Sequence, residues 1–195
     1  RSGSNAVNVS ANLRNSWRLQ LDPSITQPVV SGDRLFLASR DTHTVYAVDT
    51  VSGEQQWRYT ADGRVDSSPT LYKGLLLFGS ADGYVTCLRQ SDGELVWKFR
   101  AAPHERLIQS FGQLESVWPL HGSVLILDDL AYVSAGRSTY LDGGLFLYAI
   151  EPTTGRVVYR HQEIGPYEDH AEGVGHSYWS EGARNDVLVS DGESI

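Results

Sequence analysis

The sequence lacks the residues that several kinds of site require. Cys87 is the only cysteine among 195 residues, which excludes an intrachain disulfide, a Cys-x-x-Cys redox pair and a cysteine-based zinc cluster. Lys73 and Lys98 are the only lysines and the formal net charge is −8, so no cluster of cations is available for a nucleic-acid backbone. The apolar runs, such as 124–127, are far too short to span a bilayer. We therefore expect neither nucleic-acid binding nor membrane insertion.

Methionine is absent as well. The first residues, Arg1-Ser2-Gly3-Ser4-Asn5, contain neither an initiator residue nor the apolar core of a signal peptide. We expect the chain to be a piece of a longer or processed polypeptide. Its composition of 41% hydrophobic and 10% aromatic residues predicts a globular protein with a real core.

An internal repeat of about forty residues organises the chain. Trp17, Trp57 and Trp97 are spaced by forty residues, and so are Gly53 and Gly93. Between these marks residues 35–49 align with 75–89 without a gap, which indicates two units of one design.

A third unit is enlarged. Residues 147–155 repeat 45–53, and Tyr159 stands where the earlier units have tryptophan, but Gly155 follows Gly93 by 62 residues and so by 22 more than one repeat. Aligning Pro28, Pro69 and Pro119 places the added residues before Pro119 and in the stretch that leads to Leu145. The resulting division is a blade end (7–22), a blade (25–60), a second blade (65–100), an enlarged blade (114–161), a loop (162–184) and the start of a further blade (185–195).

Within each unit, short runs rich in Val, Leu, Tyr and Phe are separated by turn dipeptides. In the second unit Lys73-Gly74 and Asp82-Gly83 divide the runs, and such pairs supply the positive φ that tight β turns need. Four strands per unit at a period near forty predict an all-β propeller, because each small sheet buries its faces only against its neighbours. A β-sandwich also has closely spaced strands, but sandwiches do not usually repeat residue for residue.

One stretch has helical periodicity. Its apolar residues fall near a spacing of 3.6, although Gly112 lies in the middle: Leu107, Ile108, Phe111, Leu114, Val117 and Trp118. We expect an ordered loop there, with at most one helical turn, packed over the propeller.

Residues 47–57, Ala-Val-Asp-Thr-Val-Ser-Gly-Glu-Gln-Gln-Trp, resemble the tryptophan-docking motif of pyrroloquinoline-quinone-like propeller repeats, Ala-x-Asp-x-x-Thr-Gly-x-x-x-Trp. The second and third copies are graded versions of it. Cys87 and Arg89 replace Ala and Asp in the second, and Glu151 and Tyr159 replace Asp and Trp in the third. The motif positions are Ala47, Asp49, Gly53, Trp57, Gly93, Trp97, Ala149, Gly155 and Tyr159.

This resemblance implies a ring of seven or eight blades in which each motif tryptophan docks on a glycine of a neighbouring blade. The chain holds about four blades' worth of sequence, so the rest of the ring is expected from the same polypeptide or from a partner that covers its edges. The family also implies a bacterial protein in the periplasm or outside the cell.

Evidence for chemistry is sparse. Quinone dehydrogenases with such blades use Ca²⁺, a catalytic Asp and often a vicinal cysteine pair, and a single cysteine cannot supply that pair. We therefore assign no cofactor to this chain. Pyrroloquinoline quinone with Ca²⁺ would have to be bound by blades outside this chain. Asp169, His170, Glu172 and His176 have ligand chemistry, but a polar surface loop explains them equally and we assign no metal site. No catalytic residue is assigned.

The candidate recognition surface lies just before the aligned prolines. Equivalent positions in each blade ring the propeller axis, so these residues are expected at one mouth of the central channel. Charge and an aromatic ring together suit ligand or peptide contact. As alternatives, Trp118 packs only its own loop and Arg64 pairs only with Asp66. The candidate binding residues are Arg64, Asp66, Glu115, Trp118, His121 and Arg137.

Three functions remain open. The first is a non-catalytic module that binds a protein, peptide or polymer through the channel mouth and the expanded loops; the similar repeats of the lipoprotein of the outer-membrane β-barrel assembly machinery imply such a role. The second is part of a quinone-dependent dehydrogenase, and the third is a sensor domain of a multidomain protein.

Overall fold

The computed structural model describes residues 14–110, 112–165 and 188–190, and every regular element among them is a β-strand. Twelve strands form three four-stranded antiparallel sheets, each with its strands in chain order. The first sheet contains β1 (Val29–Ser31), β2 (Arg34–Ser39), β3 (Thr44–Asp49) and β4 (Gln55–Thr60). The second contains β5 (Thr70–Tyr72), β6 (Leu75–Gly79), β7 (Tyr84–Arg89) and β8 (Leu95–Arg100). The third contains β11 (Leu125–Leu127), β12 (Leu130–Ala135), β13 (Leu145–Ile150) and β14 (Val157–Glu163).

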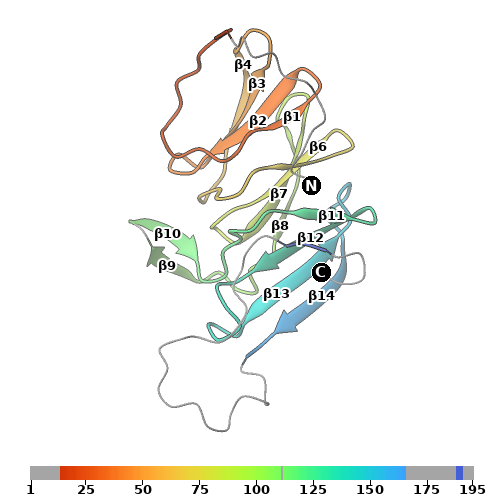
Figure 1. The fold of residues 1–195 in the computed structure, drawn as a ribbon. Helices are drawn as coiled ribbons and strands as arrows, with labels where there is room; N and C mark the ends of the chain where they lie inside the picture. Colours follow the sequence, from red (N-terminus) through yellow and green to blue (C-terminus); the bar gives the residue numbers. More distant parts are fainter. Residues whose placement is uncertain (1–13, 111, 166–187, 191–195) are drawn as a thin grey trace.

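The three sheets follow one another as the blades of a partial propeller (Figure 1). A fourth, two-stranded sheet made of β9 (Leu107–Ser110) and β10 (Gln113–Ser116) projects from the chain between the second and third sheets. The prediction of an all-β propeller fragment is therefore confirmed.

The core consists of two apolar layers, one on each face of the second sheet. Along β6, Leu76 and Phe78 pack into the layer shared with the first sheet, and Leu77 packs into the layer shared with the third. Side chains of a strand alternate between faces, so a run of apolar residues predicts a strand buried on both sides. This explains why β6 has no alternation of polar and apolar residues.

Tryptophan side chains connect each sheet to the one that follows it. The indole of Trp57 lies against Gly93, where a Cβ atom would be 2.6 Å from the ring. Trp17 on Gly53 and Trp97 on Gly155 repeat the arrangement, with corresponding distances of 2.5 and 2.8 Å. All three glycines have φ between 74° and 76°, so both the backbone conformation and the close approach require glycine.

The rest of the motif shapes the turn on which the indole rests. Oδ1 of Asp49 accepts hydrogen bonds from the backbone N–H of Val51 (2.9 Å) and of Ser52 (2.7 Å), which forms an Asx turn. These bonds, chiefly those from Ser52 and Val51, lower the pKa of the Asp49 carboxyl. On the strand, Ala47 lies opposite Trp57 in the register, as Cys87 lies opposite Trp97 and Ala149 opposite Tyr159. Tyr159 is 57% exposed.

Both enlargements of the third unit lie on one side of the propeller. Strand direction alternates within each sheet, so the connections 40–43, 61–69, 80–83, 101–124 and 136–144 all lie at the end opposite the docking turns. We call this side the insertion face. It carries the β9–β10 hairpin and the long β12–β13 loop.

Two expectations about the insertion were wrong. Residues 107–110 and 113–116 pair as a β-hairpin and do not form a loop with a helical turn, because Gly112 takes φ 78° and allows the chain to reverse between β9 and β10. The alignment of Pro119 with Pro28 and Pro69 was also wrong. Pro28 and Pro69 directly precede β1 and β5, whereas β11 begins only at Leu125.

The third sheet extends to Glu163, beyond the expected blade limit of 161. Asp169, His170, Glu172 and His176, to which no metal site was assigned, lie outside the described residues, as does most of the expected next blade (185–195).

Candidate functional site

Two arginines, two carboxylates and one histidine from four segments of the chain form one continuous network on the insertion face. Asp66, in the connection that follows β4, accepts from Arg64 Nε at Oδ1 (2.7 Å) and from His121 Nδ1 at Oδ2 (2.6 Å). Arg64 Nη2 also lies 3.5 Å from Glu115 Oε2, and Glu115 Oε1 accepts from Arg137 Nη2 at 2.9 Å. The network joins the crossing loop 61–69, the hairpin, the connection before β11 and the β12–β13 loop.

Glu115 is the centre of this arrangement. It lies on β10 and is only 4% exposed, and the side chains of Arg64 and Arg137 are also largely covered. A carboxylate removed from water needs paired charges, because an uncompensated buried charge costs several kcal/mol. The two arginines meet that need and hold the hairpin against the propeller.

Asp66 is held in its charged form. Burial acts to raise the pKa of its carboxyl, but hydrogen bonds from His121 and Arg64 outweigh burial, so that the pKa lies below the ordinary value. An ionised Asp66 accepts both bonds at neutral pH. The side chain thus connects the loop after β4 to the segment before β11.

Trp118 is not part of this surface. It is 5% exposed, its Nε1 donates to the backbone oxygen of Asp142 (2.8 Å), and its ring meets Phe146 and His104 edge to face. Trp118 therefore packs the insertion onto the third sheet, and its contacts extend beyond its own loop, to which the alternative interpretation had confined it. The structure brings the other five candidate residues together.

A further contact on this face was missed by the sequence analysis. Nε2 of His43, in the β2–β3 turn, lies 2.9 Å from Oε1 of Gln113, so the hairpin reaches back to the first sheet. Only the hairpin's register brings these residues together, and neither residue type carried a signal. Nearby, Ser67 Oγ donates to the carbonyl of Gly122 and Ser68 Oγ to that of Gln27.

The two insertions present large apolar side chains to solvent. On the hairpin, Leu107 is 58% and Leu114 is 66% exposed, and Tyr140 and Leu141 are exposed on the β12–β13 loop. An ion pair of 3.3 Å between Arg106 and Asp142 joins the two segments. Exposed apolar groups gathered on adjacent insertions are typical of a contact surface.

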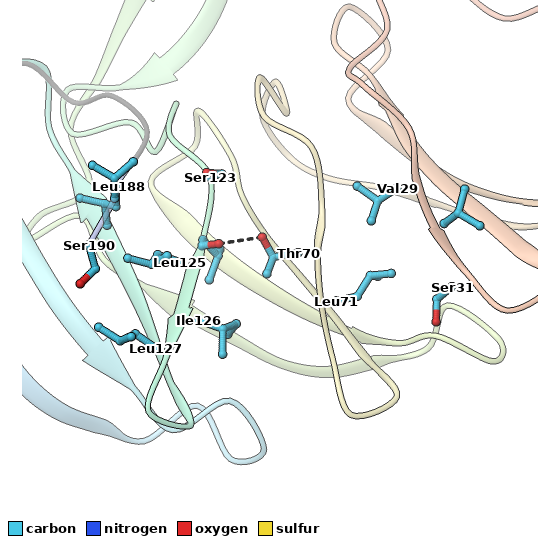
Figure 2. A pocket seen from close by; sticks show the side chains of 13 residues that line it. Val29, Ser31, Thr70, Leu71, Ser123, Leu125, Ile126, Leu127, Leu188 and Ser190 are labelled. Carbon is cyan, nitrogen blue, oxygen red and sulfur yellow. Dashed lines mark hydrogen bonds between the residues drawn. The ribbon is translucent and has the colours of Figure 1, made fainter. Parts of the chain in front are cut away.

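A cavity of about 910 Å³ lies where the innermost strands of the sheets converge, and Figure 2 shows its lining. Side chains of β1, β5 and β11 form its walls, together with Leu188–Ser190. Thr70 Oγ1 donates to the carbonyl of Val124 (2.7 Å) and joins the second and third sheets there. The lining contains aliphatic and hydroxyl side chains, and no described residue in it is titratable.

The described residues do not fit a calcium and quinone site. No group of three or more His, Cys, Asp or Glu side chains among them could hold a metal ion. Cys87 is buried between sheets, and burial raises the pKa of its thiol to about 12. Asp66 and Glu115 are already engaged by arginines.

Within the described part of the chain, no helix is long and apolar enough to cross a membrane.

The chain resembles proteins of known activity at low identity. It is 28% identical over 163 residues to the dehydrogenase subunit of the quinone alcohol dehydrogenase of Gluconacetobacter polyoxogenes, a match that covers 76% of this chain. The match covers 21% of that protein, so the chain spans about a fifth of the length of the curated relatives it matches.

Solved structures show the same fold. The quinohemoprotein alcohol dehydrogenase of Comamonas testosteroni matches with a TM-score of 0.57 and 21% identity over 70% of this chain and 20% of that one. A europium-containing methanol dehydrogenase matches with a TM-score of 0.57 and 20% identity over 71% of this chain and 24% of its own. The computationally designed Ika4 protein matches with a TM-score of 0.55 and 15% identity over 76% of this chain and 79% of the designed one.

A family model described as outer membrane protein assembly factor BamB matches residues 6–163. With its repeated units, its tryptophan contacts and this match over most of its length, the chain belongs to that family of pyrroloquinoline-quinone-like propeller repeats.

Proposed function

We propose that this chain is a non-catalytic propeller module that binds a protein, peptide or other polymer through its insertion face. Its place is the periplasm or the outside of the cell, and the rest of the ring comes from the same polypeptide. The family model, which is described as an assembly factor, supports a binding role. The sheets act as the scaffold, and the binding surface lies where the repeat is broken.

The Glu115 network is the observation that carries this proposal. An insertion that binds nothing has no need of a buried carboxylate. In this chain Arg64 and Arg137 bind the buried Glu115, which fixes the position of the hairpin relative to the loop 61–69 and the β12–β13 loop. A preorganised surface loses less conformational entropy when a partner binds. The exposed Leu107, Leu114, Tyr140 and Leu141 then supply apolar contact area.

The tryptophan contacts serve the scaffold in this proposal. Trp17, Trp57 and Trp97 each bury an aromatic surface on the following sheet and donate an N–H to it, which suits a docking role. Substitutions of these tryptophans are expected to lower the stability of the fold and to affect partner binding only as a consequence.

Site-specific photo-crosslinking tests the binding role. A photoreactive amino acid is placed at Leu114, at Tyr140 or, as a control, at Leu95, which is exposed on β8 away from the insertions. The full-length protein in its native host is expected to give discrete adducts from Leu114 and Tyr140 and none from Leu95. The same adducts from all three positions, or none from any, would contradict the proposal.

The relatives favour a second candidate, a domain of a quinone-dependent dehydrogenase. It requires blades outside the described residues to hold the cofactor. Calorimetric titration of the full-length protein with pyrroloquinoline quinone and Ca²⁺, followed by a dye-linked assay, tests it. Absence of both binding and turnover removes this candidate.

A further inference from the structure

The β9–β10 hairpin has one edge that no strand of the described chain covers. The backbone N–H of Val117 donates to the carbonyl of Arg106 (2.9 Å), so this pair is a hydrogen-bonded one and the next pair, Leu107 and Ser116, is not. The pairs alternate along the hairpin. The N–H and C=O groups of Leu107 and Gln109 therefore point away from β10.

The other edge of the hairpin is already in use. On β10, the corresponding outward N–H of Ser116 donates to the carbonyl of Ala81 (2.7 Å). Of the two hairpin edges, only the β9 edge therefore has outward backbone groups that the described chain does not pair. Two residues there offer two donors and two acceptors in strand geometry.

The side chains of β9 itself, Leu107–Ser110, are uncharged. Leu107 and Gln109 share the outward face of the hairpin with Leu114, which lies diagonally across from Leu107. The opposite face is anchored, because Glu115 is bound by arginines and Gln113 contacts His43. Natural edge strands usually carry lysine, proline or an inward charge that prevents pairing, and Leu107–Ser110 carries none of these.

We propose that β9 is a strand-addition site, at which an extended and uncharged segment of a partner protein pairs with Leu107 and Gln109. The absence of charge on the hairpin's outward face selects against charged segments, and Leu107 and Leu114 favour an apolar side chain at alternate positions of the added strand. This inference rests on the proposed binding function and specifies the partner's chemistry.

A peptide binding assay tests the inference. The probe is a capped, fluorescein-labelled peptide of alternating Val and Thr residues, titrated with the full-length protein and followed by anisotropy. The variant Gln109→Pro removes an outward N–H without removing a β9–β10 hydrogen bond, and proline is tolerated at such edge positions. Gln109→Ala is the matched control.

We expect Gln109→Pro to weaken peptide binding roughly tenfold, the effect of about 1.4 kcal/mol, and Gln109→Ala to bind as the parent does. The double variant Leu107→Ser, Leu114→Ser is expected to weaken binding as well, whereas Leu95→Ser is not. An unchanged urea midpoint for Gln109→Pro shows that the fold is intact. Equal binding by Gln109→Pro and the parent would overturn the inference, and so would self-association in sedimentation that Gln109→Pro abolishes, because a second copy then occupies the edge.

The two proposals fail separately. Peptide binding that depends on Gln109 but occurs without adducts at Leu114 and Tyr140 would overturn the binding function in the host while supporting the strand-addition site. Adducts at both positions, with peptide binding that ignores Gln109→Pro, would support the function and overturn the site.

Discussion

The indole N–H of Trp57 donates to the carbonyl oxygen of Gln90 at 3.0 Å while its ring covers Gly93 of the same turn. One side chain thus supplies both apolar contact and a hydrogen bond between two sheets. Trp17 with Thr50 and Trp97 with Pro152 repeat the relationship at 2.9 and 2.8 Å.

Gly93→Ala is expected to destabilise the fold by roughly 3 kcal/mol, because the new Cβ would both meet the Trp57 ring at 2.6 Å and sit on a backbone with φ 74°. Gly74→Ala is the matched control, since Gly74 has φ 81° but open space around it and carries only the backbone strain of about 1 kcal/mol. Urea unfolding measures both. Equal losses would show that the close approach contributes nothing.

Trp57→Ala is expected to cost about 3–5 kcal/mol, the usual range for a buried aromatic side chain. Tyr159→Ala is expected to cost under about 0.5 kcal/mol in this chain, because that ring is largely exposed. Comparing the urea midpoints tests whether the position in the repeat or the burial of the ring determines the loss of stability. A large loss at Tyr159 would mean that a part of the chain outside the described residues covers it.

Glu115→Gln is expected to destabilise the fold by roughly 3 kcal/mol, because Arg64 and Arg137 lose a buried partner. A double-mutant cycle with Arg137→Ala isolates the coupling between the two side chains. Additive losses would contradict the network.

The lowered pKa of Asp66 predicts that the free energy of unfolding falls as the solution is made acidic. Its pKa is lower in the folded protein than in the unfolded chain, where it is about 3.9, so its contribution to stability is present above that value and is lost as the pH falls through the folded pKa. Asp66→Asn is expected to be clearly destabilising at neutral pH and much less so in acid. Urea unfolding of the parent and of Asp66→Asn at neutral and at acidic pH measures the difference in stability. An equal loss of stability at the two pH values would refute the prediction.

Cys87 is expected to be inert in the native protein, because burial raises the pKa of its thiol to about 12 and removes it from solvent. Ellman's reagent should react slowly at mildly alkaline pH and rapidly in concentrated urea. Fast reaction of the native protein would place Cys87 at an accessible surface.

The propeller sheets were predictable because the sequence pattern of each strand occurs in more than one unit of the repeat. Residues 35–49 and 75–89 confirm one another, and the turn pairs mark where strands end. The insertion has no second copy, so residues 107–118 had to be interpreted from periodicity alone. Apolar residues at 107, 108, 111 and 114 fit a helix and a hairpin equally well, and the conformation of Gly112 decides between them.

Candidate site residues were predictable as a group but not in their roles. The topology of a propeller places Arg64, Asp66 and Glu115 on one face whatever their exact contacts. Burial of Trp118 depends on the path of the connection before β11, which the misaligned Pro119 obscured. The contact between His43 and Gln113 depends on the hairpin's register, which no pattern in the sequence encodes.

The tryptophan contacts all run in the same direction, from an earlier part of the chain to a later sheet, which gives the array a polarity. The first and second units each contribute one indole and one glycine turn, so precise deletion of the second unit would leave Trp57 an equivalent acceptor at Gly155. Units can therefore be lost or duplicated without any new interface having to be invented. The longer third unit is the part of the described chain that departs from this interchangeable pattern.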